Sequence, residues 1–430
     1  MNILLKNATL LPEYGFDSKQ VNVVVKDQKI AEITEKIPQN TSFDKTVDCQ
    51  GNLLTPGFYN AHCHAAMTLF RGYGEDLPLQ RWLEERIFPA EDRLTYQSTY
   101  VASQFAIAEM LRHGIVSFTD MYMFEDATAK AVLESGIKAN LSRCIVSFDP
   151  DVDMKQDFRL KEALDLVDEY HGAEQERLKI DLSLHAEYTN VPRACEYVGR
   201  VAKDRGLLMQ LHLSETEKEH LECIQRHGKT PTKFFADLGV FDAPTLAAHC
   251  VWVTDEDMET LASKGVTAVH NPVSNLKLGS GVMPLRKMLD KGINVALGTD
   301  GVASNNRLDI LREYQIAAIL HKGISKDPAS VTAQELFALA TKNGALAQGR
   351  KDCGTIKIGA RADLILLDRN AITNIPCYDD YAMLAYSASA SDVKMTMVDG
   401  RILYQNGEYT SIDEERLRYD FREVLSHYFA

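Results

Sequence analysis

The feature that most constrains the fold of this chain is a repeated alternation of short apolar runs with longer amphipathic segments. Segments of helical periodicity, such as 101–111 and 160–170, separate the runs. Strands buried on both faces of a parallel sheet have continuous apolar sequences, because neither face meets water. The eight runs are 54–58, 115–118, 139–141, 180–184, 208–213, 245–248, 266–269 and 293–297. Eight strand–helix units are what a (β/α)8 barrel requires. An open doubly wound sheet would usually carry a glycine-rich phosphate turn after its first strand, which is missing here.

Both ends of the chain have a different pattern, which indicates β-structure. Residues 21–25 and 30–33 flank a turn, and Asp399-Gly400 near the other end is typical of a tight hairpin. Two β-rich pieces at opposite ends of a chain often pair into one sheet domain. We therefore predict an α/β protein in which residues 1–57 and 361–430 form a small β-sandwich domain. Residues 58–360 are predicted to form a (β/α)8 TIM barrel.

Composition excludes several classes of partner. The 430 residues include 61 acidic and 47 basic side chains, so the net charge of -14 disfavours nucleic acid. No segment is typical of a signal peptide or a membrane span. The eight cysteines form no Cys-x-x-Cys pair and are typical of reduced thiols. We expect a cytoplasmic protein with a small-molecule substrate, and the sequence leaves open whether it forms a homo-oligomer.

Polar side chains gather where the predicted strands end, which is where barrel enzymes hold their chemistry. His62 and His64 lie two residues apart on a strand and therefore share a face. His212, His249 and Asp300 end three further strands. Four imidazoles and one carboxylate at one barrel mouth suit a zinc-like ion.

Longer motifs resemble the amidohydrolase superfamily. Its opening motif is matched by Pro56-Gly57-Phe58-Tyr59-Asn60-Ala61-His62-Cys63-His64. Further segments are similar to the family of 5-methylthioadenosine/S-adenosylhomocysteine deaminases, and this resemblance runs nearly end to end. Those segments are 65–72, 75–77, 82–83, 249–251, 271–279 and 298–306.

The resemblance implies one divalent metal ion per chain, usually Zn²⁺, held by His62, His64, His212 and Asp300. Family members with two ions usually bridge them with a carboxylated lysine at strand 4, where this chain has His185. Zinc lowers the pKa of its bound water to about 7, which gives a hydroxide at neutral pH. The hydroxide would attack the amino-bearing carbon of an adenine ring.

Three residues are expected to act in catalysis. Asp300 would take the proton of the water and pass it toward the departing amine. Glu215, three residues after His212, would protonate the ring nitrogen beside the attacked carbon. His249 would hydrogen-bond the hydroxide and fix its direction. The expected enzyme is thus a hydrolase of cyclic amidine C–N bonds. It would convert methylthioadenosine, adenosylhomocysteine or adenosine into the inosyl product and ammonia.

The resemblance also implies contacts with the nucleoside. Glu91 would bind the two ribose hydroxyls, which suit the paired acceptors of a carboxylate. His185 and Ser304 would hydrogen-bond ring nitrogens, and Trp82 would pack on the apolar part of the ligand.

Two arginines would bind the amino-acid carboxylate of adenosylhomocysteine, a fork-to-fork match. These are Arg143 and Arg159, although the acidic stretch 149–153 is hard to align and Lys155 is the other candidate for the second position. Glu187 departs from the family pattern, and an added carboxylate near the substrate would alter its preference.

Three alternatives compete with this interpretation. The zinc deaminases of another fold need His-x-Glu and Pro-Cys-x-x-Cys, and only His185-Ala186-Glu187 imitates that signature. A sister amidohydrolase acting on guanine, a triazine or another ring could share Glu215, but it would not use Glu91 or Arg143. A non-catalytic barrel subunit would commonly have lost metal ligands. His270, which ends another strand, either faces the site or makes a structural hydrogen bond.

Overall fold

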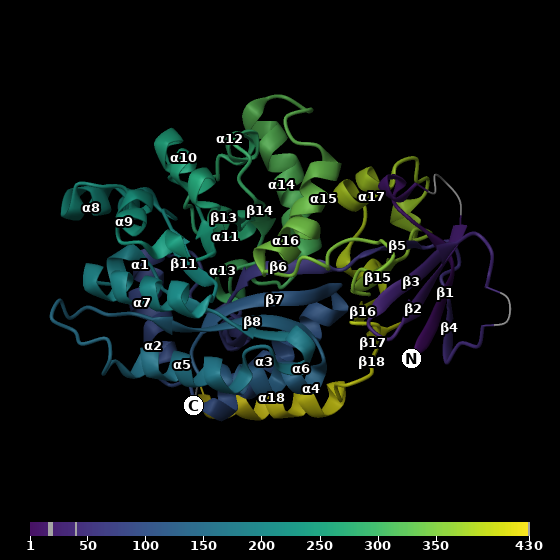
Figure 1. Cartoon of the computed structure of the whole chain (residues 1–430), viewed down its shortest axis with the longest axis horizontal. Coiled ribbons are helices and arrows are strands. Elements are labelled where there is room, and N and C mark those ends of the chain that lie inside the picture. The colour runs from purple at the N-terminus through teal and green to yellow at the C-terminus, as the bar shows by residue number, and fades with distance from the viewer. Residues whose placement is uncertain (16–19, 39–40, 429–430) are drawn as a thin grey trace.

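The computed structural model describes residues 1–15, 20–38 and 41–428, and its strands fall into two sheets (Figure 1). One is a parallel barrel sheet whose strands neighbour one another in chain order. These strands are β6 (Phe58–Cys63), β7 (Ile115–Tyr122), β8 (Lys138–Ile145), β9 (Leu178–Ile180), β10 (Leu182–Leu184), β11 (Met209–Leu213), β12 (Thr245–His249), β13 (Thr267–His270) and β14 (Val295–Leu297). β9 and β10 are two pieces of the fourth strand. The barrel closes where the N–H of Asp300, after β14, donates to the carbonyl of His62 over 2.9 Å.

The second sheet gathers strands from both chain ends and lies beside the barrel, at the right of Figure 1. Its strands are β1 (Asn2–Thr9), β2 (Gln20–Lys26), β3 (Lys29–Thr34), β4 (Lys45–Asp48), β5 (Leu53–Pro56), β15 (Leu364–Leu367), β16 (Val393–Val398), β17 (Arg401–Gln405) and β18 (Glu408–Tyr409). Asp399-Gly400 joins β16 to β17, as the hairpin signal predicts. The predicted fold class, a TIM barrel with a small β-sandwich built from both ends, is confirmed.

The apolar run 54–58 is not one barrel strand, which corrects the prediction. Its first part belongs to β5, which pairs with β15 in the sheet of the chain ends. The barrel strand β6 begins only at Phe58, and Gly57 lies between the two strands. A Cβ at Gly57 would collide with the side chain of Val116, so this crossing between the sheets requires glycine.

Helices alternate with the barrel strands along the chain, and many of them cover the outside of the barrel (Figure 1). They are α1 (Leu79–Trp82), α2 (Phe88–Glu91), α3 (Tyr96–Arg112), α4 (Glu125–Ser135), α5 (Phe158–Tyr170), α6 (Ala173–Glu176), α7 (Pro192–Arg205), α8 (Glu217–His227), α9 (Pro231–Asp237), α10 (Asp255–Lys264), α11 (Pro272–Lys277), α12 (Leu285–Asp290), α13 (Val302–Asn305), α14 (Ile310–Ser325), α15 (Ala333–Ala340), α16 (Lys342–Ala347), α17 (Asp380–Tyr386) and α18 (Glu414–Tyr428). None of them, within the described residues, has the length and apolar character needed to cross a membrane.

The last helix, α18, packs on the barrel rather than on the sheet. The ring of its Phe421 stacks on Phe105 of α3 with centroids 4.1 Å apart. The hydroxyl of Tyr428 donates to the carbonyl of Ala90 in α2. The predicted sheet domain includes residues 361–430 and therefore α18, whereas α18 contacts α2 and α3 beside the barrel. The domain boundaries therefore stay a prediction.

A buried charged cluster joins the barrel to the sheet at the amino end of the barrel strands. Lys138, the first residue of β8, forms ion pairs with Asp363 and, over 2.7 Å, with Asp399. Asp363 also accepts a hydrogen bond from the Tyr59 hydroxyl over 2.7 Å and one from the N–H of Asp399 over 2.9 Å. Every charge in this cluster thus meets a partner of opposite sign.

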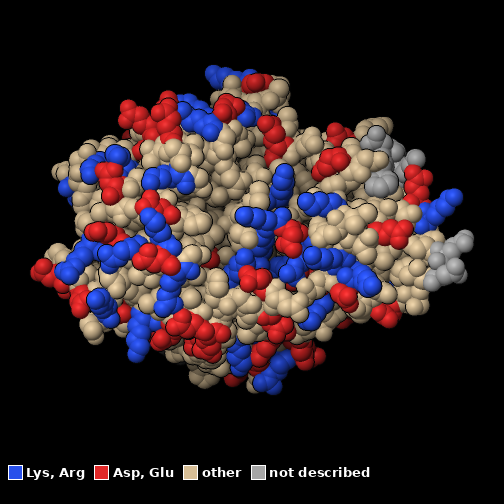
Figure 2. All heavy atoms as spheres, viewed as in Figure 1, with Lys and Arg blue, Asp and Glu red and all other residues tan. Residues whose placement is uncertain are grey.

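The outer surface is charged but mixed in sign. Acidic and basic side chains are interspersed over the face drawn in Figure 2. Many of them are paired, as Lys203 is with Asp242 over 3.1 Å. Such exposed pairs contribute little to stability.

Candidate active site

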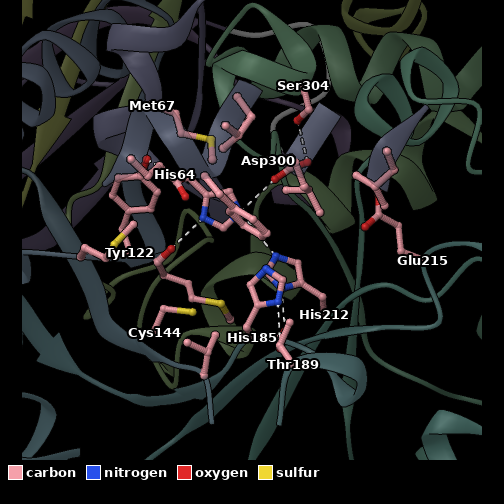
Figure 3. Close-up of a pocket in the computed structure, with 18 of the residues that line it drawn as sticks. His64, Met67, Tyr122, Cys144, His185, Thr189, His212, Glu215, Asp300 and Ser304 are labelled. Atoms are coloured by element: carbon pink, nitrogen blue, oxygen red, sulfur yellow. Dashed lines mark hydrogen bonds and ion pairs between the residues drawn. The ribbon is translucent and has the colours of Figure 1, made fainter. Parts of the chain in front are cut away.

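A cavity of about 430 Å³ opens at the carboxyl ends of the barrel strands. All but one of the predicted site residues line it, and the exception, His62, is buried against them. Figure 3 shows several of these side chains pointing toward a common centre. The lining residues that the sequence singled out are His64, Trp82, Glu91, Arg143, Arg159, His185, His212, Glu215, His249, Asp300 and Ser304.

The four predicted metal ligands converge within this cavity. Nε2 of His64 lies 3.2 Å from Oδ1 of Asp300 and 3.4 Å from Nε2 of His212. Nε2 of His62 lies 3.6 Å from the same carboxylate oxygen, and it is buried without a hydrogen-bond partner. Three imidazole nitrogens and a carboxylate oxygen therefore face a small common volume.

This donor set fits a divalent cation. Burial, followed by the neighbouring His185, lowers the pKa of His212 well below its usual range, and burial lowers that of His62 to about 4. Neutral imidazole is the form that binds a metal. At His64 burial is outweighed by Asp300, which raises the pKa to about 9, so an ion binding there would displace a proton. His249 belongs to the same cluster, because its ligand atom lies within 4.8 Å of those of His62 and His212.

The outer ring nitrogens of three histidines are held by hydrogen bonds. Nδ1 of His64 and Nδ1 of His212 each lie 2.7 Å from a backbone carbonyl. Nδ1 of His249 lies 2.8 Å from Oδ1 of Asn275 in α11. Such partners fix the orientation of a ring, so that Nε2 points at the common volume. Asn275 lies in the motif 271–279, yet the sequence alone assigned it no role.

Asp300 has a left-handed backbone conformation and is followed by a tightly packed glycine. Its φ is +61°, and a Cβ on the next residue, Gly301, would collide with Met67. Oδ2 of Asp300 accepts hydrogen bonds from Ser274 over 2.6 Å and from Ser304 over 2.7 Å. These hydroxyls leave Oδ1 facing the histidines (Figure 3). The hydroxyl of Ser304 thus donates to this carboxylate, and its expected contact with a ring nitrogen stays a prediction. The sequence alone assigned no role to Ser274.

Glu215 lies in the short loop between β11 and α8, and its side chain is buried. One oxygen accepts from Ser280 over 3.2 Å, and the other lies 3.8 Å from Nε2 of His249. Burial raises its pKa more than the charge of His249 lowers it, which favours the protonated acid. The carboxylate of Glu219 fixes this loop by accepting the N–H of Ser214 and that of Glu215.

Further along the cavity, two predicted substrate contacts are held by hydroxyl groups. Glu91, the last residue of α2, accepts from the Tyr122 hydroxyl over 2.7 Å, and burial raises its pKa to about 7. His185 places Nδ1 3.1 Å from the hydroxyl of Thr189. Trp82 is nearly inaccessible and contributes an apolar wall.

The two predicted carboxylate-binding arginines lie in different surroundings. Nε of Arg143 pairs with Glu162 over 2.7 Å, and its Nη1 donates to the carbonyl of Cys144 over 2.7 Å. The guanidinium of Arg159 stands 4.4 Å from the ring centroid of Phe158. Lys155, the alternative to Arg159, is exposed and does not line the cavity.

Glu187, which the sequence placed near the substrate, and His270, for which it left two options, both face away from the cavity. Glu187 is buried outside the cavity, where it pairs with Arg226 and, over 2.9 Å, with His227. Its charge is therefore already compensated. His270 points its Nε2 at His321 of α14 over 3.0 Å, which is a structural contact on the helix side of the barrel.

Comparison with known proteins agrees with this geometry. A sequence model of the amidohydrolase family matches residues 53–403. The chain is 43% identical to a 5′-deoxyadenosine deaminase of Methanosarcina mazei, over 97% of this chain and 96% of that one. It is equally 43% identical to a 5-methylthioadenosine/S-adenosylhomocysteine deaminase of Dictyoglomus thermophilum, over 94% and 96%. An adenosine deaminase from Xanthomonas campestris, solved with bound zinc, matches with a TM-score of 0.92 at 29% identity over 99% and 98%.

Proposed function

The chain belongs to the amidohydrolase family, and we propose that it deaminates the adenine ring of adenosine derivatives modified at the 5′ position. It is a metal-dependent hydrolase acting on C–N bonds. Water replaces the exocyclic amino group, and the products are the inosyl nucleoside and ammonia. The observation that carries the proposal is the placement of a buried acid, Glu215, beside a cluster fitted to one divalent ion.

The metal site would consist of His62, His64, His212 and Asp300, and the chemistry of this donor set favours zinc. The bound ion would supply a Lewis acid that makes water nucleophilic near neutral pH. A neutral imidazole at His212 and an unpartnered Nε2 on His62 support this assignment.

Asp300 is proposed to carry the proton from the attacking water toward the departing amine. Its Oδ2 is held by Ser274 and Ser304, so its Oδ1 stays aimed at the reacting centre. His249, fixed by Asn275, would orient the attacking oxygen. The two serine hydroxyls would keep the Asp300 carboxylate in place while it accepts the proton and passes it on.

Glu215 is proposed to protonate the ring nitrogen next to the attacked carbon. This step matters because the electron pair of the opened C=N bond needs an acceptor. Burial raises the pKa of the Glu215 carboxyl above its ordinary value, and this shift favours the proton-bearing form that a general acid needs.

The remainder of the cavity would bind the nucleoside. Glu91 would accept hydrogen bonds from the ribose hydroxyls, and His185 would contact the ring. Trp82 and its apolar neighbours suit an uncharged 5′ group, and Arg143 with Arg159 would face a 5′ carboxylate. The relatives named above act on nucleosides that share adenine and ribose and differ at the 5′ position, which supports this class.

An assay of ammonia release on zinc-loaded protein tests the proposal. We expect turnover of 5′-deoxyadenosine, methylthioadenosine, adenosylhomocysteine or adenosine, and none of free adenine, guanine or a triazine. Turnover should stop when a chelator removes the ion and return when zinc is restored. Activity confined to guanine or triazines would contradict the proposed substrate class.

A further inference from the structure

We propose that Glu162 on α5 sets the preference among 5′ substituents, because it holds and neutralises the arginine that a substrate carboxylate would need. Glu162 does not line the cavity, but it pairs with Arg143, which does. The inference rests on the proposed function and adds a specificity-determining residue behind the cavity wall.

The contact is direct, and it involves the part of Arg143 that recognises carboxylates. Nε of Arg143 lies 2.7 Å from Oε2 of Glu162, and Nη1 donates to the carbonyl of Cys144 over 2.7 Å. Within the described residues, these are the hydrogen bonds of its guanidinium. The side chain of Arg143 is 12% exposed, whereas that of Glu162 is 54% exposed. Glu162 therefore binds Arg143 from the solvent side, while Arg143 also lines the cavity.

These bonds reduce what Arg143 can offer a ligand. Bidentate recognition of a carboxylate needs two parallel N–H groups on one edge of the guanidinium. One edge contains Nε, which Glu162 occupies, and the other contains Nη1, which the Cys144 carbonyl occupies. A substrate carboxylate would have to share the arginine with Glu162, and it would also be repelled by the charge of Glu162.

The apolar wall of the cavity also favours an uncharged 5′ group on the substrate. The cavity wall contains many apolar side chains, including Phe88, Met123, Val146 and Phe148. Arg159 also lines the cavity, so a carboxylate would be disfavoured rather than excluded. We therefore expect neutral 5′ groups, such as deoxy and methylthio, to be used in preference to the homocysteinyl group of adenosylhomocysteine, which has a free carboxylate.

The test compares Glu162→Gln with the unaltered enzyme on adenosylhomocysteine and methylthioadenosine. Glutamine can still accept from Nε of Arg143, so the position of the arginine is kept while the opposing charge is removed. The ratio of kcat/KM for adenosylhomocysteine to that for methylthioadenosine should rise about two- to fivefold, the range expected for a partly exposed ion pair. The gain should lie in KM for adenosylhomocysteine and shrink at high salt.

Asp165→Asn is the matched control, because it removes one exposed carboxylate from the same helix and should leave the ratio unchanged. An unchanged or lower ratio in Glu162→Gln would overturn the inference, since a merely positioning glutamate would not compete with the substrate. The binding ratio of the two deaminated products, measured by calorimetry, should shift in the same direction. That measurement needs no turnover, so failure of the inference and failure of the proposed reaction can be told apart.

Discussion

The two ends of the barrel both bury charged side chains, but they compensate them differently. At the amino end, Lys138 meets Asp363 and Asp399, and Asp363 receives further hydrogen bonds from Tyr59 and the backbone. At the carboxyl end, Asp300 faces a group of imidazoles, and Nε2 of His62 has no hydrogen-bond partner among the described residues.

This difference separates a structural cluster from a functional one. A buried charge is costly unless it is paired, and the amino-end cluster satisfies that condition within the protein. In the carboxyl-end cluster, the buried Nε2 of His62 lacks a hydrogen bond, and a bound cation would give this nitrogen a partner. Substitutions at the amino end should therefore cost stability, and those at the carboxyl end should cost activity.

The largest effect is expected from His212→Ala, which removes one ligand from the open cluster. Turnover should fall about 10³-fold or more, because a metal Lewis acid supplies several kcal/mol of barrier lowering. Elemental analysis should find less than one ion per chain, against about one in the unaltered protein. His427→Ala, at an exposed histidine of α18, is the control. Two ions per chain in the unaltered protein, or a fully loaded variant, would contradict the single-ion site.

Lys138→Met tests the closed cluster. Methionine keeps most of the volume but leaves Asp363 buried without its cation, since Arg361 pairs only with Asp399 of these two carboxylates. Breaking a buried pair in this way costs about 3–5 kcal/mol of unfolding free energy. Denaturant titration should show that loss, while the folded variant keeps its ion and turnover. Lys161→Met, on the surface of α5, should change little. A lower turnover per folded molecule would contradict the purely structural role of the amino-end cluster.

Glu215→Gln should separate chemistry from metal binding within the carboxyl end. The amide keeps the shape of the acid but cannot give up a proton in the same way. We expect turnover to fall about 10²-fold or more while the ion content stays at the unaltered level. Near-normal turnover in this variant would show that another group protonates the ring.

Ser274→Ala is expected to have the smallest effect on metal affinity and turnover. It removes one of the two hydroxyls that orient Asp300, and Ser304 keeps the other. Loss of an outer hydrogen bond to a metal ligand typically lowers metal affinity or activity about 10- to 100-fold. Titration with a competing chelator measures the affinity, and Ser263→Ala on α10 serves as the control. An unaltered affinity and rate would mean that Ser304 alone orients the carboxylate.

The barrel and the position of its site could both be predicted from local sequence patterns. Continuous apolar runs predict buried parallel strands, and two histidines spaced by two residues must share a face. Because parallel strands end together, the sequence predicts that His62, His212 and Asp300 meet at one mouth of the barrel. The structure gathers them there.

The sequence could not decide which way some of the same polar side chains point. A strand that is apolar on both sides has no alternation to set its phase, so His270 could face either the cavity or α14. Glu187 is paired with Arg226, which lies 39 residues further along the chain, and no local spacing reveals such a partner. The prediction that 54–58 is one barrel strand was wrong for a related reason. An apolar run does not indicate which of two sheets the segment joins.

The pairing of β5 with β15 also bears on the order in which this molecule can assemble during translation. The ribosome makes β1 to β5 first, yet the strand that covers the free edge of β5 emerges only after the whole barrel has been synthesised. Contacts between such distant segments form late, because the loop that joins them must close first. Until then Lys138 has neither of its carboxylate partners, which also belong to the late segment. The sheet is thus completed only by strands that are synthesised after the barrel.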